Sequence, residues 1–289
     1  MLVVKKILVP VDFDETSLGI VQLAAGLARR FDADVLLAHV VTPRGYAPPA
    51  ETPGSGGQSG ALLANVDRFE EKDLHESVRK ELQGLRLKCL VRKGNAADEI
   101  VEMARQEAAD LIVMPTHGND GFYRYLIGSV TAKVIHESDC PVLTGAHLRE
   151  GPAGPLDVKH VLCGVTYSEH TQVALKWAAK LAEEFKAKLT LGHVTPSLEM
   201  YGPGGMYVNH RWGDELIAGA KELLAKLQKE SGVTGDTSIE SGDPAQGMAR
   251  IVSRVGADLL VIGGHTSGGR LGSYGYAIIS EAGIPVLSV

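Results

Sequence analysis

The chain has 289 residues, which is enough for two domains of ordinary size, each with a core of its own. Lysine and arginine number 29 and aspartate and glutamate number 35, so the formal net charge is −6. This acidic balance argues against bulk binding to nucleic acids or to anionic membranes, because both require a basic surface.

In the first half, short apolar runs alternate with stretches of helical periodicity. Five strands are predicted by the apolar runs at 7–11, 35–40, 87–91, 111–114 and 142–144. Helices are expected between the first two runs and over about 62–83, 97–108 and 129–138, with a glycine-rich loop at 43–60. In the first helix, Leu18, Val21 and Ala25 share one face, which we expect to be buried. Strands that alternate with helices predict right-handed crossovers and a parallel sheet.

The second half repeats this plan. Lys6–Asp12 matches His160–Thr166, and Val35–Val40 matches Leu189–Val194 at the same offset. Three more pairs follow in the same order: Gly94 with Gly242, Ala109–Met114 with Ala257–Ile262, and Gly128–Ser129 with Gly272–Ser273. Five matched landmarks in one order indicate a tandem duplication. We therefore predict two doubly wound, Rossmann-like α/β domains with five-stranded parallel sheets, over residues 1–147 and 156–289.

Residues suited to binding a nucleotide gather at the carboxyl ends of the strands in the first half. In open α/β sheets, ligands bind at this edge, where the strand order reverses. Asp12 follows the first strand, while Pro115-Thr116-His117-Gly118 follows the fourth and leads, after nine residues, to Gly128-Ser129 before a helix. The start of that helix offers unpaired N–H groups to a phosphate, and Asp12 suits a ribose hydroxyl or a metal-bound water. Each feature taken alone is also explained as a helix cap.

This arrangement resembles the universal stress protein family, whose nucleotide-binding members carry Gly-x2-Gly-x9-Gly-(Ser/Thr). Here Pro115 stands in place of the first glycine, whereas Gly118, Gly128 and Ser129 keep the spacing of the motif. The opening Pro10-Val11-Asp12 also matches the family, and the resemblance covers almost the whole chain. It implies an adenine-nucleotide alpha-hydrolase-like fold for both domains.

The resemblance also implies a site for ATP, or for ADP or AMP, in the first half. The adenine would lie against Val11, Val40 and Met114, the ribose at Asp12 and the phosphates over the glycine motif. The implied binding residues are Pro10, Val11, Asp12, Val40, Met114, Pro115, His117, Gly118, Gly128, Ser129 and Val130. Mg²⁺ would accompany ATP, and Asp12 is the candidate to hold it through a bound water.

The resemblance further implies how the two copies are arranged. Family members usually pair through the fifth strand, so residues 141–144 and 285–289 are expected to pair within the chain. A homodimer formed on top of this internal pairing stays open.

The second half departs from the nucleotide-binding pattern. Thr166 stands where the first half has Asp12, and Thr266 stands at the position of Gly118. Only five residues separate Thr266 from Gly272, so four residues of the phosphate loop are missing. We therefore predict no standard ATP site in this half, although its glycines and Arg270 could still surround a small anion.

The histidines and cysteines carry weaker signals. His39 and His193 occupy matching apolar strands, where a core histidine bonded to a backbone carbonyl is favoured over a metal ligand. The three cysteines form no CxxC pair, which argues against a disulfide framework and a four-thiolate zinc site. With no signal-peptide order at the N-terminus and no apolar run as long as a membrane span, we expect a cytoplasmic protein.

No catalytic residue is assigned, because the P-loop, HExxH and GxSxG patterns are absent from the sequence. The favoured hypothesis is a non-enzymatic, ATP-binding regulator of the stress response, in which the nucleotide orders the segment 115–128. One alternative is a slow ATPase that uses Asp12 to hold Mg²⁺ or its water. Another is a module that binds no nucleotide, in which Pro115 spoils the loop and the aromatic segment 201–212 binds a partner or another small molecule.

Overall fold

The computed structural model describes residues 4–12, 15–42, 78, 80–116, 127–145, 157–166, 168, 170–196, 210–264, 271 and 273–289. The elements of the first half are β1 (Lys6–Pro10), α1 (Glu15–Phe31), β2 (Asp34–Val41), β3 (Leu87–Lys93), α4 (Ala96–Glu107), β4 (Leu111–Pro115), α5 (Ser129–Glu137) and β5 (Val142–Gly145). The strands and helices expected in these ranges are therefore confirmed. The helix expected over 62–83 falls outside the described residues except at 78 and 80–83, where the chain makes turns.

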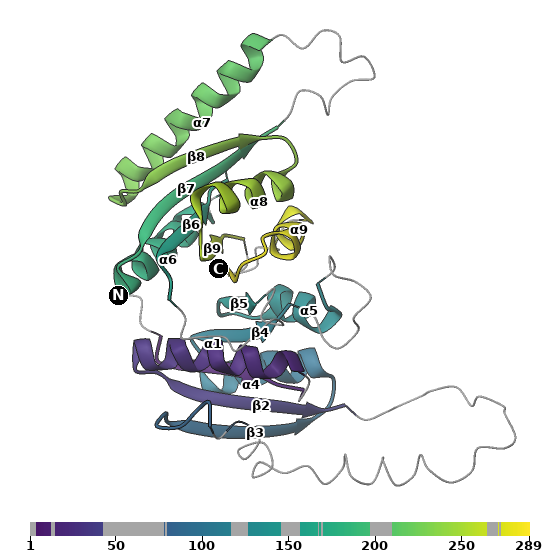
Figure 1. Ribbon diagram of the computed structural model, residues 1–289. Coiled ribbons are helices and arrows are strands. Elements are labelled where there is room, and N and C mark those ends of the chain that lie inside the picture. Colours follow the sequence, from purple (N-terminus) through teal and green to yellow (C-terminus); the bar gives the residue numbers. More distant parts are fainter. Residues whose placement is uncertain are drawn as a thin grey trace, which may run out of the picture.

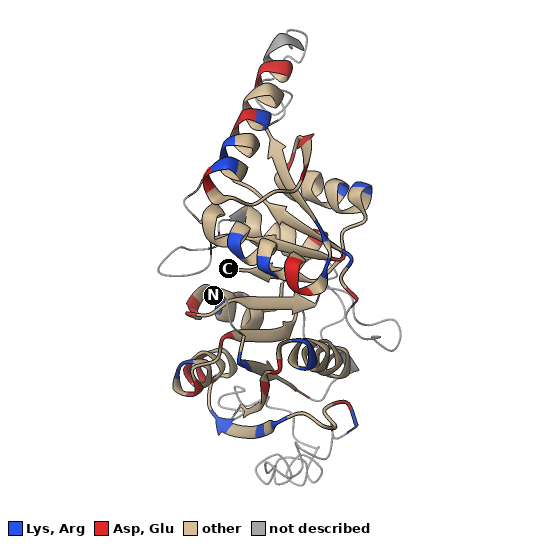
Figure 2. Cartoon of the chain, turned by 90° about the vertical axis from the view of Figure 1, so that its left-hand side faces the viewer, with Lys and Arg blue, Asp and Glu red and all other residues tan. Residues whose placement is uncertain are grey.

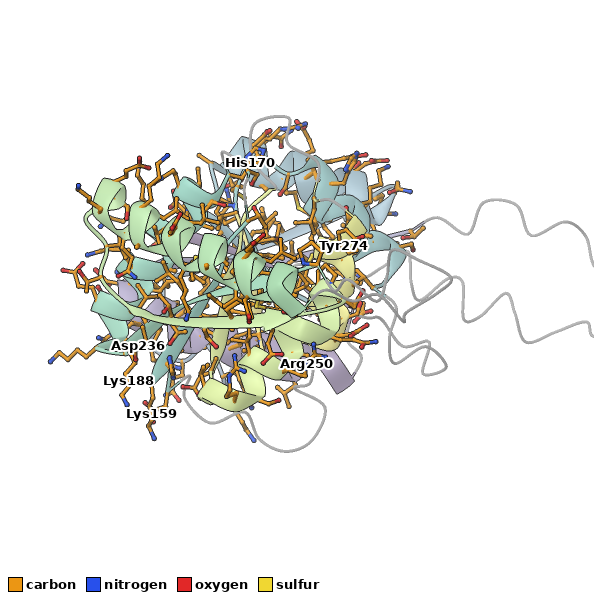
Figure 3. The ribbon with its side chains drawn as sticks, turned by 90° about the horizontal axis from the view of Figure 1, so that it is seen from above. Lys159, His170, Lys188, Asp236, Arg250 and Tyr274 are labelled. Carbon is orange, nitrogen blue, oxygen red and sulfur yellow. The ribbon has the colours of Figure 1, made fainter. Side chains whose placement is uncertain are left out.

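The second half repeats the order of the first. Its elements are β6 (His160–Gly164), α6 (Thr171–Phe185), β7 (Lys188–Thr195), α7 (His210–Ser231), β8 (Asp236–Ser241), α8 (Pro244–Val255), β9 (Leu259–Ile262), α9 (Ser273–Glu281) and β10 (Val286–Ser288). Lys159, Lys188 and Asp236 mark the neighbouring amino ends of β6, β7 and β8, which run parallel (Figure 3).

The ten strands of the described ranges form one sheet in the order β3-β2-β1-β4-β5-β10-β9-β6-β7-β8, and the two halves lie one above the other (Figure 1). Pairing is parallel within each half and antiparallel between β5 and β10, where Thr144 faces Val286. Two buried hydroxyls cross this seam: Thr144 donates to the Val286 carbonyl and Ser288 donates to the Val142 carbonyl, both at 3.2 Å. The pairing expected between the fifth strands is therefore present within the chain.

Helices cover both faces of the sheet and bury two apolar layers that run through both halves. One layer lies beneath α1, α6 and α7 and includes Ile7 and Leu175, and the other lies beneath α4, α5, α8 and α9 and includes Leu8 and Ile251. Charged residues lie mostly on the helices, at strand ends and on the edge strand β3 (Figure 2). Within the described ranges, no helix combines the length and apolar character that crossing a bilayer requires.

One expectation about the core is wrong. Leu18 was expected to face the sheet but is 44% exposed, whereas Val21 and Ala25 on the same helix are buried. In the second half, Val173 in the first turn of α6 is likewise exposed. Both helices begin at the carboxyl edge of the sheet, so their first turns have little sheet beneath them to cover an apolar side chain.

Candidate functional site

The strand order places a topological switch in each half. In the first half, the chain runs from β1 outward through β2 to β3, and then continues on the other side of β1 with β4 and β5. The loops that leave β1 and β4 therefore diverge at the carboxyl edge, which is where open α/β sheets bind their ligands. In the second half, β6 lies between β7 and β9 in the same way.

The structure brings most of the expected site residues to this edge of the first half. Pro10 ends β1 and is followed by Val11 and Asp12. Val40 lies near the end of β2, and Met114 and Pro115 end β4. Gly128 precedes α5, whose first two residues are Ser129 and Val130. Asp12, Ser129 and Val130 are exposed, whereas Val11 and Met114 are buried. His117 and Gly118 lie outside the described residues.

Val11 is held by two hydrogen bonds to β2. Its N–H donates to the Ala38 carbonyl at 2.8 Å, and its carbonyl oxygen lies 2.8 Å from Nδ1 of His39. A carbonyl oxygen can only accept, so Nδ1 of His39 carries the hydrogen. His193 makes the same contact with the Val165 carbonyl at 2.8 Å, which confirms that both histidines bond to backbone carbonyls. Asp12 thus directly follows a residue that two hydrogen bonds hold in place.

The first turn of α5 is docked on the end of β4. The Gly128 N–H donates to the Thr116 carbonyl and the Thr131 hydroxyl donates to the Pro115 carbonyl, both at 2.9 Å. The N-cap residue of α5 is Gly128, which has no side chain to accept a hydrogen bond from the first turn. In α4, by contrast, the side chain of the N-cap residue Asn95 accepts such bonds. The first N–H groups of a helix have no intrahelical partner, so those of α5 are available to an anionic group.

Sequence reasoning missed two threonines at this edge. Thr131 is buried and forms the bond described above. Thr116 is only 1% exposed, yet its hydroxyl has no hydrogen-bond partner among the residues that the structure describes. Thr116 lies inside the glycine motif, so its position was visible, but nothing in the sequence marks its hydroxyl as unpaired. The bond of Thr131 joins residues 16 positions apart, and local patterns carry no signal for it.

The equivalent edge of the second half is closed by contacts within its own chain. The Thr171 hydroxyl donates to the Thr166 carbonyl at 2.8 Å, and the Thr166 hydroxyl lies 2.9 Å from that of Ser168. A Cβ atom at Gly263 would be only 2.6 Å from the carbonyl oxygen of His170, so the start of α6 approaches the end of β9 closely (Figure 3 labels His170). Pro115 stands at the position of Gly263 in the first half, where its ring would prevent such an approach.

Charge near the site is partly neutralised by pairing. Lys133 in α5 donates to the carboxylate of Asp98 in α4, which raises the pKa of Lys133. This ammonium is therefore engaged with α4. Among the residues that the structure describes, no group of three or more His, Cys, Asp or Glu side chains could hold a metal ion. A contact between Asp12 and Mg²⁺ through water stays a prediction.

Cys163 is buried and Cys140 is half-buried. Burial raises the pKa of the Cys163 thiol to about 12, and burial with the nearby carboxylates of Asp110 and Asp139 raises that of Cys140 to about 12. Both side chains therefore stay protonated at neutral pH, and a thiol is a far weaker nucleophile than a thiolate.

Comparisons with known proteins cover nearly the whole chain. The model of the universal stress protein family matches residues 4–144 and again 157–289. A universal stress protein of Methanocaldococcus jannaschii is 37% identical over 141 residues, which are 48% of this chain and 80% of that protein. One from Mycolicibacterium smegmatis is 25% identical over 98% of this chain and 96% of its own length.

Among solved structures, a universal stress protein from Archaeoglobus fulgidus superposes with a TM-score of 0.69 at 19% identity, covering 100% of this chain and 97% of that one. At this identity the likeness shows the fold alone. The similarity in sequence and in fold extends over both halves.

Proposed function

Because the chain belongs to the universal stress protein family, we propose that its first half binds an adenine nucleotide, ATP together with Mg²⁺, and that the protein acts as a nucleotide-responsive regulator. The observation that carries this proposal is the uncapped start of α5 at the same sheet edge as the exposed Asp12. A helix start of this kind attracts phosphate, and a carboxylate suits a ribose hydroxyl.

Each part of the nucleotide has a matching surface in this proposal. The buried Val11 and Met114 and the half-buried Val40 offer apolar contacts to the adenine ring. Asp12 accepts hydrogen bonds from the ribose, and it can also hold a water bound to Mg²⁺. The N–H groups of Ser129 and Val130, with the Ser129 hydroxyl, donate to phosphate oxygens. Pro115, His117 and Gly118 form the other side of the phosphate-binding loop in this proposal.

The second half is proposed to bind no nucleotide. Thr166 replaces the carboxylate of Asp12 and its hydroxyl is already engaged with Ser168. The close approach of His170 to Gly263 also occupies space that an open crevice would leave to a ligand. We therefore expect one nucleotide per chain.

The regulatory step is proposed to be a change of the segment 115–128 on nucleotide binding, which alters the surface offered to a partner. A cytoplasmic location belongs to the same proposal. The fifth strands already pair within the chain, so any homodimer has to form through another surface.

Two measurements test the proposal. Acid extraction of freshly purified protein, followed by mass spectrometry, should release ATP or ADP at about one per chain. Calorimetric titration of nucleotide-free protein with ATP and Mg²⁺ should give the same stoichiometry. About two nucleotides per chain would refute the inactive second half. No nucleotide in the extract and no heat of binding would refute the proposal and favour a module that binds another ligand.

A pair of matched variants locates the site. Gly118→Val places a branched side chain in the path of the phosphates and should abolish ATP binding. Thr266→Val changes the matching position of the second half and should leave binding unchanged. If Gly118→Val binds ATP as tightly as the unmodified protein, the assignment of the site is wrong.

A further inference from the structure

The docking of α5 on β4 depends on a side chain as well as on the backbone. Thr131, the third residue of α5, is 3% exposed, and its hydroxyl donates to the Pro115 carbonyl at 2.9 Å. This bond ties the first turn of the helix to the last residue of the strand. The Gly128 N–H bond to the Thr116 carbonyl provides a second tie one residue further along.

The second half builds the same strand and helix without this threonine. Gly275 stands at the position of Thr131, and a Cβ atom there would be 2.4 Å from Cγ of Leu271. Leu271 is itself buried, so an apolar side chain packs the start of α9 where the first half has a hydroxyl. Gly264 stands at the position of Thr116, and its N–H donates to the Val289 carbonyl at 3.0 Å.

The second half has the same strand and helix as the first but lacks the glycine spacing of the site. β9 and α9 form and pack with no hydrogen bond from a side chain at position 275. The strand–loop–helix unit of the second half therefore forms without a threonine bond in this turn. It occurs in the half that keeps the spacing of Gly118, Gly128 and Ser129.

We infer that Thr131 is a positioning residue for the phosphate groups of the nucleotide, and this inference rests on the proposed function. By fixing α5 against the end of β4, its hydroxyl sets where the N–H groups of Ser129 and Val130 point. The attraction of a helix start falls off within one turn, so a small displacement of the turn weakens it. Binding groups have to be held to within about 0.5 Å and 10–20° to act fully.

The test compares the affinity for ATP with the affinity for adenosine, which has no phosphate. Thr131→Val keeps the shape of the side chain and removes the hydroxyl, and it should weaken ATP binding about five- to tenfold while leaving adenosine binding unchanged. Thr131→Ser retains the hydroxyl and should restore ATP affinity. Thr195→Val is the matched control, because Thr195 is also 3% exposed and donates to the Glu240 carbonyl at 3.2 Å in the second half.

The outcomes are distinct. If the unmodified protein binds ATP and Thr131→Val binds it equally well, the inference is wrong and the proposed function stands. An equal loss for ATP and adenosine, or a loss of ATP affinity in Thr195→Val as well, would show a general structural role and overturn the inference. Failure of the unmodified protein to bind ATP overturns both. If Thr131→Val does not fold, Thr131→Ala against Thr131→Ser isolates the hydroxyl in the same way.

Discussion

The ends of α4 and α8 offer a matched test of backbone conformation in the two halves. α4 ends on Ala108, which has φ 52° and ψ 55°, and α8 ends on Gly256, which has φ 64° and ψ 48°. The two residues occupy equivalent positions and make equivalent helix-end bonds. Ala108 donates its N–H to the carbonyls of Ala104 and Arg105, and Gly256 donates to that of Val252.

The effects of Ala108→Gly and Gly256→Ala on the free energy of unfolding follow from this geometry. The left-handed conformation costs a residue with a Cβ atom about 1–2 kcal/mol, whereas glycine loses about 0.4–1 kcal/mol more backbone entropy on folding. The methyl group of Ala108 is exposed, and a Cβ atom at Gly256 would meet no atom within 4 Å. Packing therefore contributes little at either position. Ala108→Gly should raise the free energy of unfolding by about 0.5–1 kcal/mol, and Gly256→Ala should lower it by a similar amount.

The assay is urea denaturation followed by circular dichroism, with the slopes of the transitions compared between variants. Equal slopes allow the midpoint shifts to be converted into differences in stability. A lower midpoint for Ala108→Gly, or an unchanged midpoint for Gly256→Ala, would refute the argument. The double variant should restore the stability of the unmodified protein, because the two sites are independent.

Two further predictions concern buried groups. Thr116→Val replaces a buried hydroxyl that has no partner in the described part of the chain with a methyl group, and it should stabilise the nucleotide-free protein by about 1 kcal/mol in the same assay. A loss of stability would show that the hydroxyl has a partner. Folding raises the pKa of the Cys163 thiol from its usual value of 9.0 to about 12. As the pH rises, the unfolded chain therefore loses this proton before the folded protein does. Stability should therefore fall as the pH rises from about 9 towards 12, and Cys163→Ala should reduce the slope by about 1.4 kcal/mol per pH unit. An unchanged slope would show that the thiol titrates normally in the folded protein.

Local patterns in the sequence were sufficient to predict the strands and helices of the described ranges. A run of about five apolar residues indicates a buried strand, and apolar residues that recur with a period of about 3.6 indicate a helix. Both signals lie within short windows of the sequence. The tandem repeat extended this prediction to the second half. The bonds of His39 and His193 were also foreseen, since an imidazole in an apolar strand needs a nearby partner and a backbone carbonyl is the commonest one.

Packing at the sheet edges could not be read in the same way. Leu18 fits the apolar periodicity of α1 and is nevertheless exposed, because burial depends on how far the sheet extends beneath the first turn. Periodicity identifies the face of a helix but carries no information about what lies opposite each turn.

By itself, the sequence determined the order of elements, the duplication and the edge at which Asp12, Pro115 and Ser129 meet, because periodicity and repeats are properties of the chain alone. Only the tertiary structure decided that Thr131 bonds to Pro115, that the described residues offer the Thr116 hydroxyl no partner and that His170 approaches Gly263. These contacts join residues from different elements, so they depend on the distances and angles at which the packed helices and strands finally lie.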